Sequence, residues 1–88
     1  MGIMKVPKGQ HFIKQNDKIT QLYLIIQGKV RQLQGKDSYL IENNNLVGLS
    51  ECLEGNYQDE YIAEEDCILY PFAYEKPQDF LKIFEEQP

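Results

Sequence analysis

The clearest structural signal in the chain is Leu22-Tyr23-Leu24-Ile25-Ile26-Gln27-Gly28-Lys29-Val30. Residues 22–26 are apolar or aromatic at every position, which is typical of a strand with both faces buried. Gln27 and Gly28 interrupt this run, and a second strand-like segment begins at Val30. The pattern therefore predicts two consecutive strands joined by a short turn, inside a structure of two layers.

Further short strands, separated by turn residues, are predicted on both sides of this stretch. Pro7 and Gly9 mark one turn, and the run Asn43–Asn45 marks another, because Asn tolerates a left-handed backbone better than any residue except Gly. The predicted strands cover residues 3–6, 11–14, 22–26, 30–34, 38–42, 57–63 and 67–70, with the last ended by Pro71. Many short strands at close spacing are typical of a small antiparallel sandwich or barrel.

Two helical segments are also predicted. Leu49–Leu53 is expected to form one or two helical turns, with Ser50 as the capping residue. A second helix begins at Pro77, because proline suits the first position of a helix. An apolar stripe at helical spacing supports this second helix and comprises Pro77, Phe80, Leu81 and Phe84.

Composition limits the possible classes of function. The chain has 88 residues with 42% apolar side chains, which suits a single packed domain over residues 1–88. Its net charge of −5, with Arg31 as the only arginine, argues against binding to nucleic acid or to anionic membranes. The sequence shows no secretory signal and no apolar run of about 20 residues, so a cytoplasmic protein is expected.

Few side chains offer catalytic or metal chemistry. Cys52 and Cys67 lie in apolar settings and are interpreted as small core residues, with a redox-sensitive Cys52 as the alternative. His11 is the only histidine, whereas a metal site or an acid–base catalyst normally needs several partners. The sequence therefore predicts a non-enzymatic protein without catalytic residues or metal ligands; a metal enzyme of the cupin type is the alternative.

The segment Val47-Gly48-Leu49-Ser50-Glu51 has the expected shape of an anion-binding turn but not its charge. Backbone N–H groups in a glycine-led turn before a helix favour a negative charge. The acidic residues Asp59 and Glu60, which follow shortly after, repel anions. A hydrophobic turn that only packs against the sheets is the competing interpretation, and Leu49 and Leu53 favour it.

Four motifs together resemble the cyclic-nucleotide-binding domain family of catabolite-activator-type regulators, kinase regulatory subunits and gated channels. They are Val6–Ile13, similar to its PxGxxI strand pair; Leu22–Val30, similar to its LYxIxxGxV signature; Asn43–Gly48, similar to the start of its phosphate-binding cassette; and Glu65–Tyr70, similar to the strand that closes its barrel. The resemblance implies a mainly β fold: a small antiparallel double-stranded β-helix (jelly-roll or β-roll) with a short cassette helix and a C-terminal helix. The family's flanking helices are longer, so we expect either a reduced domain or part of a longer protein.

The family's nucleotide-holding residues are changed in this chain. The family has a Glu after the cassette glycine that accepts a hydrogen bond from the ribose, and Leu49 stands there. The family's phosphate-pairing Arg falls at Asp59, or at Glu60 with a one-residue slip, and both are acids. The resemblance therefore implies a degenerate nucleotide site, with no certain cofactor and with cyclic AMP and cyclic GMP disfavoured as ligands.

Two hypotheses of function follow from the resemblance. The first is a non-catalytic regulatory module with a degenerate nucleotide site, acting through a protein partner or as a homo-oligomer. The alternative is a working sensor that binds a cyclic nucleotide or another small ligand between the cassette and the roll, with Arg31 reaching its phosphate. The candidate ligand-binding residues are Val47, Gly48, Leu49, Ser50, Glu51, Asp59, Glu60 and Arg31. The tyrosines Tyr39, Tyr57 and Tyr61 are expected either to form a contact surface or to pack in the core.

Overall fold

Two four-stranded antiparallel sheets make up the fold of the computed structural model, which describes residues 2–73. The elements are β1 (Met4–Val6), β2 (His11–Ile13), β3 (Gln21–Gln27), β4 (Val30–Gln34), β5 (Asp37–Ile41), β6 (Leu46–Val47), the 3₁₀ turn η1 (Cys52–Glu54), β7 (Glu60–Ala63) and β8 (Cys67–Ala73). The helix predicted from Pro77 lies outside the described residues. No helix within residues 2–73 is long and apolar enough to cross a membrane.

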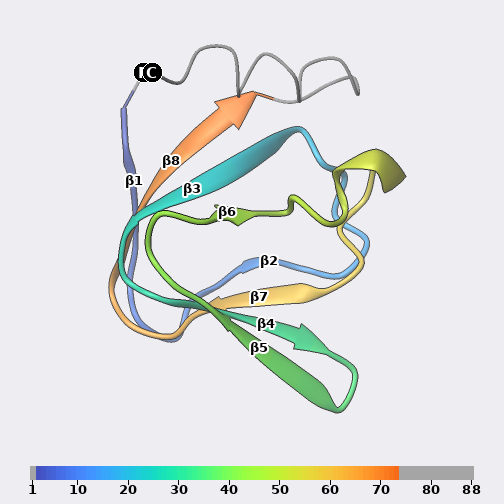
Figure 1. Ribbon diagram of the computed structural model, residues 1–88, viewed down its shortest axis with the longest axis horizontal. Coiled ribbons are helices and arrows are strands. Elements are labelled where there is room, and N and C mark those ends of the chain that lie inside the picture. The colour runs from blue at the N-terminus through green and yellow to red at the C-terminus, as the bar shows by residue number, and fades with distance from the viewer. Residues whose placement is uncertain (1, 74–88) are drawn as a thin grey trace.

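The chain winds back and forth between the two sheets. One sheet has the order β1-β8-β3-β6 and the other β2-β7-β4-β5, so most consecutive strands belong to opposite sheets (Figure 1). Strands β4 and β5 are the exception, because they form a hairpin that projects from the body of the roll (Figure 1). This winding of paired strands is the β-roll that the sequence predicted, and the fold class is confirmed.

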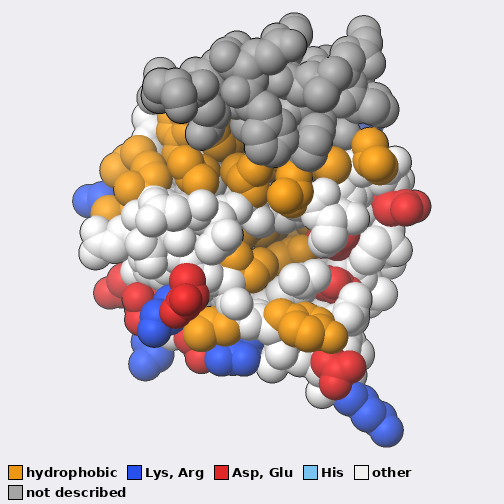
Figure 2. Space-filling view, in the orientation of Figure 1, with side chains coloured by type: hydrophobic (Ala, Val, Ile, Leu, Met, Phe, Trp, Pro, Cys, Tyr) orange, Lys and Arg blue, Asp and Glu red, His pale blue; other side chains and the backbone are white. Residues whose placement is uncertain are grey.

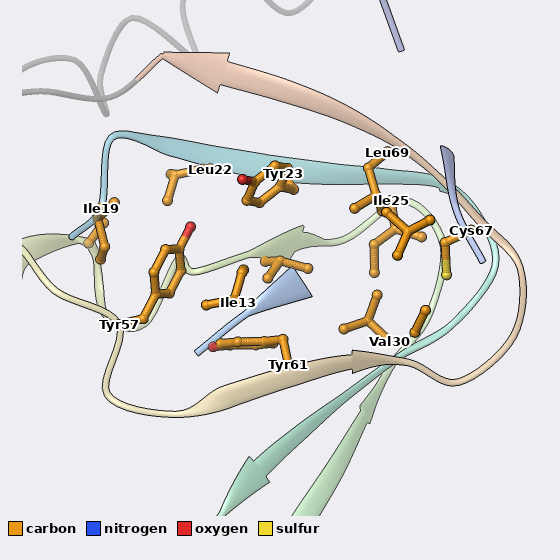
Figure 3. Close-up of a cluster of buried hydrophobic side chains, with 14 residues drawn as sticks. Ile13, Ile19, Leu22, Tyr23, Ile25, Val30, Tyr57, Tyr61, Cys67 and Leu69 are labelled. Atoms are coloured by element: carbon orange, nitrogen blue, oxygen red, sulfur yellow. The ribbon is translucent and has the colours of Figure 1, made fainter. Parts of the chain in front are cut away.

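The core fills the space between the two sheets. The completely buried side chains include Leu22 and Ile25 of β3 and Leu69 of β8. Figure 3 shows these side chains facing Ile13 and Tyr61 of the opposite sheet. Strand β3 lies between β8 and β6 and faces the second sheet, which buries Leu22, Tyr23 and Ile25. Ile26 is 44% exposed, so the expected burial of both faces along residues 22–26 is not observed.

Gly28 makes the turn between β3 and β4 possible. Its φ angle is +109°, a conformation that residues with a Cβ atom rarely adopt. A Cβ atom at this position would lie 2.7 Å from the carbonyl oxygen of Asp66 and 2.8 Å from Sγ of Cys67. The turn is therefore packed directly against the chain that leads into β8, and only glycine fits there without a shift.

Two of the predicted strand boundaries are wrong by three residues, and the others by one at most. Strand β8 runs through Pro71, which pairs with Tyr23 of β3. This is possible because β1 pairs with β8 only as far as Leu69, so the other side of Pro71 needs no ladder hydrogen bond within the described chain. The strand predicted over residues 57–63 is shorter: β7 begins at Glu60, and the residues before it form a loop.

Candidate functional site

The segment that the sequence nominated for anion binding lies at one end of the roll. Val47 ends β6, and Gly48 follows with a φ angle of +94°. A Cβ atom on Gly48 would lie 2.8 Å from the Tyr57 ring and 3.0 Å from Leu22. We use the name cassette for residues 47–60, because this chain segment leaves the sheet at Val47, closes on Tyr57 and returns in β7 at Glu60.

Tyrosine side chains form the inner wall of the cassette. Tyr57 and Tyr61 are buried, with their ring centroids 5.9 Å apart in an edge-to-face arrangement (Figure 3). The Tyr57 hydroxyl donates a hydrogen bond to the backbone carbonyl of Gln21 at 2.7 Å. Burial raises the pKa of both phenols well above their usual range. These two tyrosines are core residues, whereas Tyr39 is 49% exposed on the β4–β5 hairpin.

Glu51 points into the cassette and is only 4% exposed. Its Oε2 accepts hydrogen bonds from the backbone N–H groups of Gln58 and Asp59, the latter at 3.0 Å. Its Oε1 accepts a hydrogen bond from the hydroxyl of Tyr61. The Glu51 carboxylate is thus held by three donors, two from the returning half of the cassette and one from Tyr61 of β7.

The short helical segment is smaller than predicted and is not capped by Ser50. Only η1 is helical, and the residue at its N-cap position is Glu51, whose side chain makes no cap hydrogen bond. Ser50 and Leu49 are both exposed. Cys52 is buried, and its thiol donates a hydrogen bond to the carbonyl of Leu49 at 3.2 Å. The local turn is therefore stabilised by backbone and thiol contacts.

Asp59 and Glu60 lie side by side in sequence but have different surroundings. Asp59 is 7% exposed and accepts a hydrogen bond from the Gln32 amide of β4 at 2.6 Å. Glu60 is partly exposed and lies 2.9 Å from Nδ1 of His11 on β2. Among the described residues, Asp59 and Glu51 are the buried charged side chains, and both belong to the cassette.

Arg31 is not brought together with the other predicted site residues. Its guanidinium makes two hydrogen bonds to the Glu64 carboxylate, at 2.9 and 3.1 Å, and one to Ser38 at 3.0 Å. Its neighbour Gln32 contacts the cassette through Asp59, and successive side chains of a strand point to opposite faces. Arg31 therefore lies on the face of β4 that is turned away from the cassette.

A polar pocket of about 350 Å³ opens beside the returning half of the cassette. It is lined by Gln15, Leu33, Gly35, Gln58, Asp59 and Glu60. Two predicted site residues, Asp59 and Glu60, thus face a common hollow. In residues 2–73 there is no group of three or more His, Cys, Asp or Glu side chains placed to hold a metal ion.

Comparison with known families agrees with this architecture. The family model described as the cyclic nucleotide-binding domain matches residues 3–86. The chain belongs to the cyclic nucleotide-binding domain family. Members of this family are ligand-sensing regulatory modules, typically non-catalytic, and the resemblance predicted from the sequence is confirmed. No curated protein sequence matches the chain closely enough to count as a relative.

Several solved structures have a similar fold. The catabolite activator protein of Thermus thermophilus is 25% identical over 96% of this chain, with a TM-score of 0.72. A regulatory subunit of a cAMP-independent protein kinase A from Trypanosoma brucei has 17% identity, 99% coverage and a TM-score of 0.78. The EAL enzyme Bd1971 in its cAMP-bound form has 17% identity, 99% coverage and a TM-score of 0.73. This chain spans 41%, 36% and 24% of those three chains respectively.

Sequence reasoning missed the partners of the cassette acids. It nominated Glu51 and Asp59 but not the backbone of residues 58–59, Tyr61 or Gln32, which hold them. One usable signal was present: core packing was one of the two expectations for Tyr61, and a buried tyrosine hydroxyl requires a partner. The two backbone donors have no sequence signal, because any residue except proline supplies an N–H group.

Proposed function

We propose that this domain is a non-catalytic regulatory module whose nucleotide site no longer binds cyclic nucleotides and which acts by contact with a protein partner. The observation that carries the proposal is the burial of two carboxylates, Glu51 and Asp59, inside the cassette. No arginine, lysine or histidine of the described chain forms an ion pair with either of them. The cassette interior is therefore negative where a phosphate would need positive charge.

Electrostatics opposes a bound phosphate in this setting. Two like charges 4 Å apart repel by about 4 kcal/mol at an effective dielectric constant of about 20. A missing arginine also removes a charge-assisted hydrogen bond, worth about 1.5–3 kcal/mol. Together these terms are comparable with the free energy of micromolar binding, about 8 kcal/mol. Arg31 does not offset them, because its guanidinium is paired with Glu64 on the other face of β4.

Exposed apolar side chains support the protein-contact half of the proposal. Leu49 and Leu53 of the cassette are 40% and 74% exposed, and Leu40 of the hairpin is 42% exposed. Figure 2 shows hydrophobic side chains reaching the surface over several parts of one face. Exposed apolar groups of this kind occur at protein interfaces, where large side chains contribute most of the binding energy.

Calorimetric titration with cyclic AMP and cyclic GMP tests the lost nucleotide site. We expect no heat of binding with either nucleotide at micromolar protein concentration. The EAL enzyme Bd1971, whose structure was solved with cAMP bound, serves as the positive control under the same conditions. A one-to-one binding isotherm with a micromolar dissociation constant for this chain would contradict the proposal.

A second candidate function, a sensor for a less anionic ligand, is favoured by the polar pocket beside the cassette. Asp59 and Glu60 line this pocket, and both are acidic. Carboxylates on a pocket wall suit a ligand with amine or hydroxyl groups better than a phosphate. A thermal-shift screen of neutral and cationic metabolites tests this candidate, with Arg31→Ala as the matched variant. A stabilising ligand whose effect survives Arg31→Ala would support a site built by the cassette without Arg31.

A further inference from the structure

The Glu51 carboxylate has the surroundings of a bound anion. Two consecutive backbone N–H groups, those of Gln58 and Asp59, donate to its Oε2, and the Tyr61 hydroxyl donates to its Oε1. Consecutive backbone N–H groups that converge on one oxygen are a common way for proteins to hold an oxyanion. The donors belong to the loop before β7 and to β7 itself, so the carboxylate bridges the two halves of the cassette.

Burial makes these contacts necessary. A buried carboxylate without a partner is very costly, and within the described residues no cation pairs with Glu51. Hydrogen bonds to the ionised form are the remaining way to stabilise it. The same argument applies to the donors: the N–H of Asp59 and the hydroxyl of Tyr61 are buried and need an acceptor.

We propose that the Glu51 carboxylate is a built-in anion that occupies an oxyanion site of the cassette, and that this site binds a small free carboxylate or phosphate once Glu51 is removed. The proposal deepens the proposed function, on which it rests, by naming what fills the site in place of a ligand. The cassette is then closed by its own side chain, and its conformation does not depend on a dissociable ligand. Gln58 and Asp59, whose backbone N–H groups hold the carboxylate, also line the polar pocket of about 350 Å³.

Chemical rescue of Glu51→Ala by acetate tests the proposal. The substitution removes a CH₂–COO⁻ group, which has the size of acetate. We expect acetate to shift the amide resonances of residues 58 and 59 in the full 88-residue variant and to raise its midpoint of urea unfolding. Inorganic phosphate is the second probe, and sodium chloride at equal ionic strength is the control for screening. A folded Glu51→Ala chain whose amides ignore both acetate and phosphate would overturn the proposal.

Three further proteins make the comparison specific. Glu51→Gln keeps the volume of the side chain, so acetate should not affect it. Glu54→Ala removes an exposed acid from η1 and should show neither amide shifts nor rescue. The unmodified chain should show no acetate response at residues 58 and 59, because its own carboxylate holds the donors. An equal acetate response in all four proteins would mean a non-specific effect and would count against the site.

A measurement on the unmodified chain keeps the test decisive if Glu51→Ala does not fold. Through-hydrogen-bond scalar coupling should connect the amide nitrogens of residues 58 and 59 to the side-chain carboxyl carbon of Glu51. These amides should also exchange with solvent at least about tenfold more slowly than expected for a loop exposed to water. Rapid exchange without coupling would overturn the proposal.

Titration of the unmodified chain with cyclic AMP distinguishes failure of the proposed function from failure of the built-in anion. If the unmodified chain binds cyclic AMP while the amides of residues 58 and 59 stay unshifted, the lost-nucleotide-site proposal fails and the built-in anion remains. If cyclic AMP binds and shifts these two amides, the nucleotide displaces Glu51, and both proposals fail.

Discussion

The two ends of the roll use the same backbone device for different purposes. At the β3–β4 turn, Gly28 has a positive φ angle and presses against the backbone carbonyl of Asp66 and the thiol of Cys67. At the cassette, Gly48 has a positive φ angle and presses against the Tyr57 ring. What differs is the charge buried nearby: the cassette encloses the carboxylates of Glu51 and Asp59, whereas the other end encloses only the Cys67 thiol, whose pKa is raised by burial.

This difference distinguishes the Gly28 end, which stabilises the fold, from the cassette end, which forms the candidate site. The Gly28 end contributes to stability by packing, and its groups are not suited to binding a ligand. The cassette end contains two buried carboxyl groups that are held by specific hydrogen-bond donors. Substitutions at the first end should therefore change stability alone, and substitutions at the second should change stability and the response to small anions together.

The largest loss of stability is expected at the Gly28 end of the roll. Gly28→Ala places a Cβ atom within 3.0 Å of the backbone of Asp66 and Cys67 and strains the positive φ angle. We expect a loss of about 3–5 kcal/mol in the free energy of unfolding, because backbone cannot move aside as a flexible side chain can. Urea denaturation followed by circular dichroism measures it.

Gly35→Ala is the matched control for this substitution. Gly35 also has a positive φ angle, +60°, but nothing lies within 4 Å of its added Cβ atom. Only the left-handed backbone penalty remains, about 1–2 kcal/mol. Equal losses for Gly28→Ala and Gly35→Ala would show that the close approach at Gly28 contributes nothing.

The second effect is expected at the cassette. Glu51→Ala leaves the Asp59 N–H and the Tyr61 hydroxyl buried without an acceptor. We expect a loss of about 2–4 kcal/mol, because each unsatisfied buried donor costs about 1–3 kcal/mol. Thermal unfolding of the variant beside Glu54→Ala measures it, since removal of the exposed Glu54 should change stability by no more than about 0.5 kcal/mol. A Glu51→Ala chain as stable as Glu54→Ala would erase the contrast between the two ends.

The contrast also explains which features the sequence could predict. The strands around Gly28 could be predicted because apolar runs and turn residues are local sequence signals. The cassette acids Glu51 and Asp59 were named as candidate residues, but their hydrogen-bond partners were not, since the Gln32–Asp59 contact joins residues 27 positions apart. The role suggested for Arg31 depended on the direction of its side chain, which the alternation of β4 and the distant Glu64 determine. Pro71 was taken as a strand end because the sequence does not show where β1 stops pairing.

A smaller loss of stability should distinguish the contribution of the Tyr61 hydroxyl from that of the backbone donors. Tyr61→Phe keeps the buried ring but removes the hydroxyl that donates to Glu51. We expect a loss of about 1.5–3 kcal/mol, the usual range for a hydrogen bond to a charged group. Phe has nearly the same shape as Tyr, so the ring packing against Tyr57 should persist. Urea unfolding measures the loss, and an unchanged stability would mean that Glu51 needs only the backbone donors.

The smallest effect concerns the ion pair outside the cassette. The hydrogen bond from Arg31 lowers the pKa of the Glu64 carboxyl below its usual value of 4.5. A carboxyl with a lowered pKa in the folded state stabilises the protein above its unfolded pKa, and this contribution disappears as the pH falls through the lowered value. Both side chains are about one third exposed, at 32% and 41%, so water weakens the pair.

Comparison of the unmodified chain with Arg31→Gln between pH 7 and pH 3 tests this ion pair. We expect Arg31→Gln to unfold at a slightly lower temperature at pH 7, where Glu64 is ionised. The difference should shrink below about pH 4.5, the unfolded pKa, because protonation of Glu64 ends the attraction in the unmodified chain. Binding of acetate to Glu51→Ala should be the same with and without Arg31, since Arg31 faces away from the cassette. A stability difference that grows in acid, or an acetate response that needs Arg31, would place this arginine in the site rather than outside it.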